Sequence, residues 1–278
     1  MIRAGIFALL TLTICTPAGL PQGPIVEYEE KSAYSKIRIL REKNTRTLGF
    51  VRESGDVITE SMVDLDKPHE MLITYTKHMF LSYLYRPKQE RVLIVGLGGG
   101  AMVHFLKKYD PNVKVDVVEI DPAIVKIADK YFNMRSGGNV NIITQDALDY
   151  LAKTDVRYDV IYMDAFLKPS TVTDGNGIPL HLKTVQFYKD IQKKLAPDGL
   201  VMFNVHPSDH VQDDLKNIRA AFANGYVYRM PQLRGFVAVG STAKQKAGIA
   251  DLRQAGDELD KRFQTSYSFR EMVDRLAP

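Results

Sequence analysis

The sequence predicts an α/β protein with two structural units: a small N-terminal β unit and a larger domain built around a parallel sheet. Across residues 86–278, continuous apolar runs typical of buried parallel strands alternate with amphipathic helical segments. Residues 24–85 read instead as short strands followed by one helix. The 278 residues, 45% of them hydrophobic and 25% charged, are enough to bury one large core and a smaller appended unit.

Residues 1–23 have the pattern of a secretory signal peptide. Arg3 precedes an apolar run over residues 4–14 that is too short to span a bilayer, and small residues ending at Ala18 offer a cleavage site. Cleavage would remove Cys15, the single cysteine, which suits an oxidising compartment. We therefore expect an exported protein, periplasmic or secreted, with no stable membrane insertion after cleavage. The alternative is a cytoplasmic protein in which the segment is not functional.

Charge and cysteine usage exclude several functional classes. The net charge of +4 is mildly basic, and no dense stripe of Lys and Arg with interleaved aromatics is present, so we expect no nucleic-acid binding. One cysteine allows neither an intramolecular disulfide framework nor a cysteine-cluster metal site. His181, His206 and His210 match no tight ligand spacing, so no metal is predicted.

The N-terminal β unit shows alternating polar and apolar residues over 36–40 and again over 47–51, which predicts two half-buried strands. A turn is expected at 53–56, where Gly55 precedes Asp56. A helix is predicted over residues 68–84, because apolar side chains recur there at helical spacing.

The larger domain is predicted from a regular order of strands and helices. Buried strands are expected at 91–95, 114–120, 140–144, 158–163 and 200–205, and helices at 123–132, 184–195 and 211–222. Two strands at 225–229 and 235–239, which carry Tyr226, Tyr228 and Phe236 as sheet core, should form an antiparallel hairpin. One charged amphipathic helix is expected over 249–276.

A glycine-rich loop directly follows the first buried strand and precedes a helix. Its sequence is Gly96-Leu97-Gly98-Gly99-Gly100-Ala101. Glycines allow a close approach of backbone to ligand and leave free N–H groups at the helix N-terminus. Gly96, Gly98 and Ala101 also fit the relaxed dinucleotide fingerprint, and we predict that Gly96, Gly98, Gly99 and Gly100 bind a ligand. A tight turn without a ligand is the alternative.

Carboxylates end the next three strands. Glu119 lies about twenty residues after the glycine loop, where an acidic residue accepts hydrogen bonds from ribose hydroxyls, whereas Asp121 before Pro122 is placed to cap the next helix. Asp146, with Ala147 beside it, is placed to hold an adenine amino group, and Asp164 follows the fourth strand. Carboxylates at three successive strand ends resemble the Rossmann-like class I S-adenosylmethionine-dependent methyltransferase fold more than a nicotinamide dehydrogenase.

From about residue 27 to residue 242, the chain resembles the polyamine aminopropyltransferase (spermidine synthase) family and its bacterial spermidine synthase-like branch. The resemblance rests on the segments 92–101, 118–122, 164–166, 178–182 and 187–188. It implies aminopropyl transfer from decarboxylated S-adenosylmethionine to a small amine such as putrescine, with methylthioadenosine as by-product, and a homodimer. It also implies catalytic roles for Asp164, which would assist deprotonation of the attacking amine, and for Tyr75 in the substrate site.

Two positions depart from the synthase pattern. Gly99 stands where synthases place an Asp that meets the donor's amine, and Leu167 stands near a second Asp. Asp174 and Glu60 are the nearest acids by alignment that could replace them. The departures leave three alternatives open: an S-adenosylmethionine-dependent methyltransferase, a nicotinamide-binding oxidoreductase and a non-catalytic protein that binds an adenosyl ligand.

Overall fold

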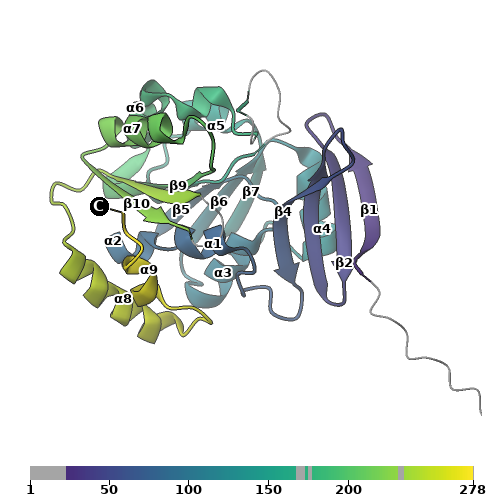
Figure 1. The fold of residues 1–278 in the computed structure, drawn as a ribbon, viewed down its shortest axis with the longest axis horizontal. Coiled ribbons are helices and arrows are strands. Elements are labelled where there is room, and N and C mark those ends of the chain that lie inside the picture. The colour runs from purple at the N-terminus through teal and green to yellow at the C-terminus, as the bar shows by residue number, and fades with distance from the viewer. Residues whose placement is uncertain (1–22, 167–172, 175–176, 231–234, 278) are drawn as a thin grey trace, which may run out of the picture.

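The computed structural model describes residues 23–166, 173–174, 177–230 and 235–277, so the predicted signal segment and Leu167 lie outside the described residues. These residues form two sheets, one of four strands and one of seven (Figure 1). Helices cover both faces of the larger sheet, and α4 contacts both this sheet and the smaller one. The predicted α/β class with a small N-terminal β unit is confirmed.

The smaller sheet is an antiparallel meander of strands in sequence order. Its members are β1 (Ile25–Lys31), β2 (Lys36–Glu42), β3 (Thr45–Val51) and β4 (Val57–Asp64). The two strands expected from alternation are β2 and β3, and the turn after β3 contains Gly55 at a φ of +90°. Tyr28 on β1 contacts Tyr131 on α4 with a ring separation of 5.2 Å, which joins the sheet to the larger unit.

The larger sheet has the order β10-β11-β9-β8-β5-β6-β7. Its strands are β5 (Arg91–Val95), β6 (Lys114–Glu119), β7 (Val140–Thr144), β8 (Tyr158–Met163), β9 (Leu195–Val205), β10 (Asn224–Arg229) and β11 (Phe236–Ser241). The pair β10–β11 is antiparallel, as predicted, and β5 to β9 run parallel. Strand order reverses at β5, and ligands of open α/β sheets bind at the carboxyl ends of the strands at such a point.

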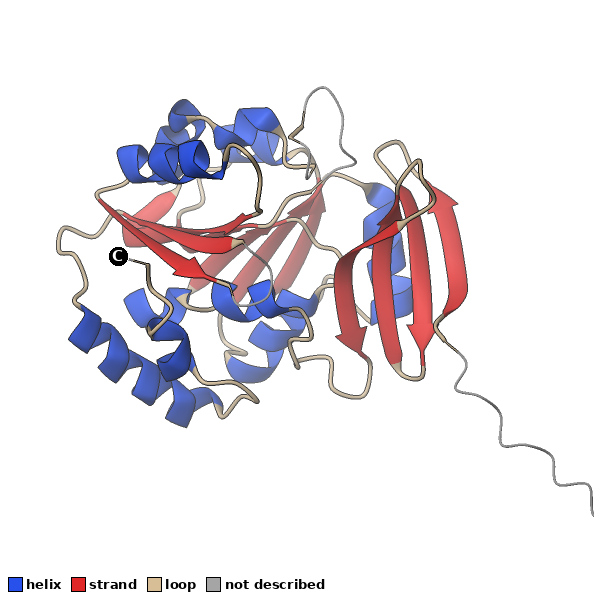
Figure 2. Cartoon of the chain, in the orientation of Figure 1, coloured by secondary structure: helices blue, strands red, loops and turns tan. Residues whose placement is uncertain are grey.

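Side chains that alternate along a strand pack into two separate hydrophobic cores, one on each face of the larger sheet. Val92 and Ile94 face one core, whereas Leu93 and Val95 face the other. Three helices cover the second face: α5 (Ala147–Lys153), α6 (Val185–Gln192) and α7 (Val211–Ala221). On the first face lie α3 (Ala101–Tyr109) and α4 (Pro122–Phe132), and the short 3-10 helix η1 (Leu180–Lys183) leads into α6 (Figure 2).

The prediction of a single helix over residues 68–84 is wrong. The structure has two short helices there, α1 (Thr74–Met79) and α2 (Ser82–Tyr85), joined by i→i+3 backbone bonds such as Leu81 N to His78 O at 3.1 Å. The reason is tertiary packing: Phe80, at the junction, is fully buried and stacks on Phe105 at 4.0 Å. Both helices therefore pack against the seven-stranded sheet.

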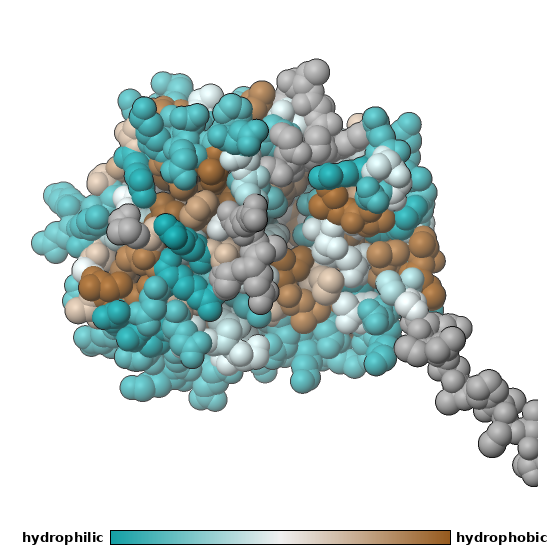
Figure 3. Space-filling model, in the orientation of Figure 1, coloured by the Kyte–Doolittle hydropathy of each residue, from teal (hydrophilic) through white to brown (hydrophobic). Residues whose placement is uncertain are grey.

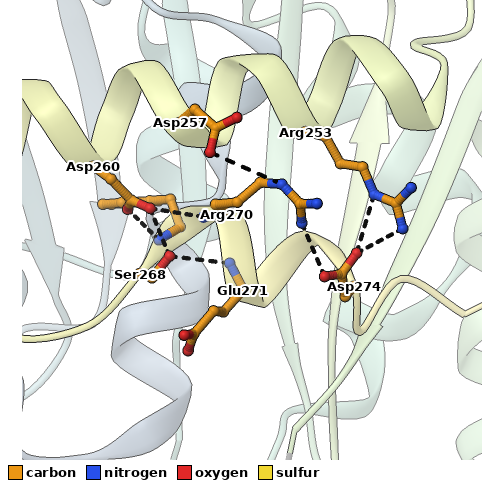
Figure 4. A network of polar contacts seen from close by, with 8 residues as sticks. Arg253, Asp257, Asp260, Ser268, Arg270, Glu271 and Asp274 are labelled. Carbon is orange, nitrogen blue, oxygen red and sulfur yellow. Dashed lines mark hydrogen bonds and ion pairs between the residues drawn. The ribbon is translucent and has the colours of Figure 1, made fainter.

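The C-terminal helix predicted over 249–276 is also two helices, α8 (Ile249–Phe263) and α9 (Phe269–Val273). Gln264 ends α8 in the left-handed conformation, with a φ of +48°. Asp260 accepts hydrogen bonds from Ser268 Oγ and from the Phe269 backbone, both at 2.5 Å (Figure 4). A Cβ on Gly256 would lie 2.8 Å from the Arg270 Cα, so only glycine permits this close approach of α9.

The surface in Figure 3 is mostly hydrophilic, with smaller hydrophobic groups, one of them over the four-stranded sheet. Ile25 and Val26 on β1 are among the exposed large hydrophobic residues, at 43% and 56%. Within the described residues, no helix combines the length and the apolar character that a membrane crossing requires.

Candidate functional site

One cavity brings most of the predicted site residues together. It has a volume of about 1140 Å³, counting its open mouth, and lies where the carboxyl ends of β5, β6, β7 and β8 meet the smaller sheet. The predicted residues on its wall are Tyr75, Gly96, Gly98, Gly100, Glu119, Asp146, Ala147 and Asp164. The smaller sheet supplies the facing wall through Leu48 and Phe50 on β3 and Glu60 and Ser61 on β4.

The glycine loop is shaped by two close contacts. A Cβ on Gly96, which has a φ of +97°, would lie 2.3 Å from the carbonyl oxygen of Asp164. Gly100 caps α3 with a φ of +72°, and a Cβ there would lie 2.4 Å from Met134 Cγ. Only glycine fits both positions, and the resulting turn points the N-terminus of α3, the positive end of its dipole, toward the cavity.

Gly99 is the one predicted glycine that the cavity wall does not include. It is buried, and a Cβ at this position would lie 2.7 Å from the Phe132 ring and 2.9 Å from Ser61 Oγ. An aspartate therefore does not fit here unless Phe132 and Ser61 move. Ser61 Oγ donates no hydrogen bond to the described residues, and its hydroxyl is placed at the glycine loop beside the cavity.

Glu119 joins the end of β6 to the glycine loop. Its two carboxylate oxygens accept backbone hydrogen bonds from Leu97 and from Asp121, each at 2.9 Å. Burial raises the pKa of Glu119, and these backbone bonds oppose the rise. A carboxylate has lone pairs for about four bonds, so Glu119 can accept two more from a ligand. Asp121 caps α4 by accepting from the Ala123 backbone at 2.9 Å, as predicted.

Asp146 has a structural task as well as its place on the cavity wall. Its Oδ1 caps α5 by accepting from the backbone N–H of Leu148 at 2.7 Å and of Asp149 at 3.3 Å. Its Oδ2 accepts no hydrogen bond from the described residues. The cap fixes the carboxylate, and the second oxygen is left to receive a donor such as an amino group.

Asp164 follows β8 and is fixed by two neutral donors. Tyr75 Oη donates to Oδ2 at 3.0 Å, and Asn204 Nδ2 donates to Oδ1 at 3.0 Å. Removal from water raises the pKa of Asp164 to about 6, although both hydrogen bonds lower it. Burial and the Asp164 charge raise the pKa of Tyr75 well above its usual range, so the phenol stays protonated and remains a donor.

Glu60 on β4 gives the cavity a second carboxylate close to Asp164. Burial, and then the negative charge of Asp164, raise the pKa of Glu60 to about 7, while Arg52 lowers it. Within the described part of the chain, neither Glu60 nor Asp164 forms an ion pair. Two carboxylates with raised pKa values, neither of them ion-paired among the described residues, create a site that favours a cationic ligand.

A family model settles which known proteins this architecture belongs with. The model of the spermine/spermidine synthase domain matches residues 62–247, well over half of the chain. The chain belongs to this family. The matched range contains Tyr75, the glycine loop, Glu119, Asp146 and Asp164, and it begins within β4 of the smaller sheet.

Two curated relatives align with this chain over most of its length. A polyamine aminopropyltransferase of Vibrio vulnificus is 28% identical over 263 residues, which cover 93% of this chain and 85% of the relative. Another, of Chromobacterium violaceum, is 29% identical over 250 residues, covering 88% of this chain and 90% of the relative.

Solved structures show the same fold at lower identity. A spermidine synthase in complex with the transition-state analogue AdoDATO has a TM-score of 0.69 and 20% identity, covering 91% of this chain and 85% of that one. Human methyltransferase-like protein 13 in complex with SAH has a TM-score of 0.64 and 24% identity, covering 70% of this chain and 94% of that one.

Of the two acids considered as replacements in this synthase-family chain, the structure places only Glu60 at the cavity. Asp174 is not among the residues that line it and pairs with Lys183 at 2.8 Å, so its role as a replacement acid stays a prediction. His181 lines the cavity, His206 packs against Phe166 and His210 is exposed. Among the described residues, no three His, Cys, Asp or Glu side chains are grouped as metal ligands.

Sequence reasoning missed Asn204, Ser61 and Ser35. Asn204 is a buried polar residue inside the apolar run that forms β9, and that interruption was the available signal. Ser61 and Ser35 belong to the smaller sheet and to the turn before β2, and nothing in their local sequence marks them. Ser35 is 4% exposed, and its hydroxyl has no hydrogen-bond partner among the described residues.

Proposed function

We propose that the protein is a polyamine aminopropyltransferase that transfers the aminopropyl group of decarboxylated S-adenosylmethionine to a small amine such as putrescine. Family membership and the aminopropyltransferase relatives support the reaction type. The observation that carries the proposal is the pair Asp164 and Glu60. Both carboxylates line the same cavity, Asp164 from the larger sheet and Glu60 from the smaller one, and both have raised pKa values, so a cationic amine would be attracted to the space between them.

The donor's adenosyl part fits the side of the cavity formed by the seven-stranded sheet. Glu119 has free lone pairs for the ribose hydroxyls, and Asp146 Oδ2 can accept from the adenine amino group. The glycine loop allows the backbone to approach the ligand closely. This division leaves Asp164, Tyr75 and Glu60 for the reacting end of the donor and for the acceptor amine.

Asp164 then acts as the proton acceptor. The amine nitrogen forms a bond to the carbon beside the sulfonium, the carbon–sulfur bond breaks, and the sulfur keeps the electron pair as a neutral thioether. The proton released from nitrogen goes to the Asp164 carboxylate. Tyr75 and Asn204 hold that carboxylate in place, and Glu60 attracts the cationic amine. Because an ionised carboxylate is needed, activity should fall below about pH 6.

Product analysis tests this proposal. Purified protein supplied with putrescine and decarboxylated S-adenosylmethionine should release methylthioadenosine. Asp164→Asn keeps the shape of the side chain but removes the proton acceptor, so turnover should fall by about 10²–10⁴-fold. Binding of methylthioadenosine should change little. The exposed carboxylate Asp190 on α6 provides a matched control, Asp190→Asn, which should keep full activity.

Methyl transfer is the second candidate, and Gly99 is the observation that favours it. Phe132 and Ser61 occupy the space that an aspartate at position 99 would need, so the loop offers no carboxylate to discriminate against intact S-adenosylmethionine. Consumption of S-adenosylmethionine with release of S-adenosylhomocysteine would establish this activity. Binding of both ligands without either product would instead leave a non-catalytic adenosyl-binding protein, and tighter binding of NAD would favour an oxidoreductase.

A homodimer forms part of the proposal. Its basis is the family to which the chain belongs.

A further inference from the structure

We infer that Asn204 is a positioning residue for Asp164, which holds the carboxylate in the orientation and ionisation state that proton transfer needs. The inference rests on the proposed function for its consequence in catalysis. Its physical basis, the contact between the two side chains, is independent of the reaction.

Strand register produces the contact. β8 and β9 are parallel, and Met163 pairs with Phe203, so the next residues, Asp164 and Asn204, lie level at the carboxyl edge of the sheet. On the other side of β8, Asp164 N donates to Val95 O at 3.0 Å, which fixes the backbone of the carboxylate. Asn204 Nδ2 donates to Asp164 Oδ1 at 3.0 Å, and the other carboxylate oxygen, Asp164 Oδ2, accepts from the Tyr75 hydroxyl.

The amide oxygen of Asn204 indicates that this residue does not serve to stabilise the fold. Asn204 is 5% exposed, and its Oδ1 is buried without a hydrogen-bond partner among the described residues. A buried acceptor without a partner destabilises a fold, and an apolar side chain of similar shape would avoid the penalty. An asparagine at this position is therefore explained by the donor that it directs at Asp164.

Asn204 is suited to this task because it is neutral. A lysine or arginine at this distance would lower the pKa of Asp164 strongly and would repel an amine cation. An amide donor stabilises the ionised carboxylate without adding charge. The titratable groups that share the cavity wall with Asp164 are Tyr75 from α1, Glu60 from β4, His181 from η1 and Tyr34 before β2, with Glu119, Asp121 and Asp146 at or near the other strand ends.

The test compares Asn204→Leu and Asn204→Ala with a matched control, Asn224→Leu. Asn224 is a similarly buried asparagine on β10, but its Nδ2 donates to the Ala243 carbonyl at 2.6 Å, away from the cavity wall. The pKa of Asp164 is measured by carbon NMR titration of aspartate-labelled protein, with Asp164→Asn assigning the signal. All variants are also prepared with Glu60→Gln, which removes the titration of the neighbouring carboxylate.

Losing one hydrogen bond to a charged group should raise the pKa of Asp164 by about one to two units in both Asn204 variants. The pH at which kcat/KM falls on the acid side of its profile should rise by the same amount. The Kd for methylthioadenosine should stay unchanged. Asn204→Leu should keep or raise the melting temperature. Asn224→Leu should lower the melting temperature and leave the pKa of Asp164 unchanged.

An unchanged pKa of Asp164 in folded Asn204→Leu and Asn204→Ala would overturn the inference. So would a lowered melting temperature combined with an unchanged acid side of the kcat/KM profile, because that result describes a purely structural residue. The titration needs no turnover. A protein that forms no aminopropyl product but shows the shifted pKa would refute the proposed function and support the effect of Asn204 on the carboxylate.

Discussion

At the scale of single residues, two neighbouring acids at the end of β6 have different tasks. Glu119 binds the backbone of the glycine loop through Leu97, and Asp121 caps α4. Glu119→Gln should weaken binding of methylthioadenosine by about 1–3 kcal/mol, since it loses charge-assisted hydrogen bonds. Asp121→Ala should instead lower the free energy of unfolding by about 1 kcal/mol. Calorimetric titration and urea unfolding of both variants separate the two roles. Equal losses of affinity at unchanged stability would show that Asp121 also binds ligand.

The sequence identified the residues that end strands, because the carboxyl ends of parallel strands always meet at one edge. Glu119, Asp146 and Asp164 were predicted on that basis, and the cavity contains all three. Contacts between side chains of different strands could not be predicted from the sequence, because they depend on how the strands pair and pack. Asn204 meets Asp164 only through the pairing of β8 with β9, and Ser61 meets the glycine loop only through the packing of the smaller sheet.

At the scale of elements, the packing of α9 on α8 depends on one glycine. A Cβ on Gly256 would lie 2.8 Å and 3.0 Å from backbone atoms of Arg270, which cannot move like a side-chain end. Gly256→Ala gains helix propensity of at most about 1 kcal/mol but overpacks this contact, at a cost of about 1–3 kcal/mol. The urea midpoint should therefore fall. The exposed position Gln254 on the same helix gives the control Gln254→Ala, which should change it little. A higher midpoint for Gly256→Ala would show that α9 does not need this approach.

Element type followed well from periodicity, whereas element ends did not. Each predicted strand of the larger sheet is present, because its apolar run reflects burial on both faces. The segments 68–84 and 249–276 read as single helices because apolar spacing continues across their breaks. Those breaks come from burial of Phe80 and from the capping of α9 by Ser268 and Asp260, which are tertiary effects.

At the scale of the whole molecule, we propose that the mature chain is exported and lacks its first residues. The charged start, the short apolar run and the small residues ending at Ala18 are the basis. N-terminal sequencing of the native protein should begin near Gly19, and thiol titration should find no cysteine, because Cys15 is removed. An intact form beginning at Met1 in the soluble cytosol would contradict this proposal.

The cavity has two walls from two different sheets, and this division has a consequence for how such an enzyme diversifies. The strand ends of the larger sheet supply Glu119 and Asp146, while β4 of the smaller sheet supplies Glu60, which lies close to Asp164. In the proposed arrangement, changes at Glu60 would alter the amine that is accepted and leave the carboxylates that recognise the nucleoside in place. Selection can therefore act on acceptor choice without passing through variants that have lost their donor, so related chains would retain one wall and vary the other.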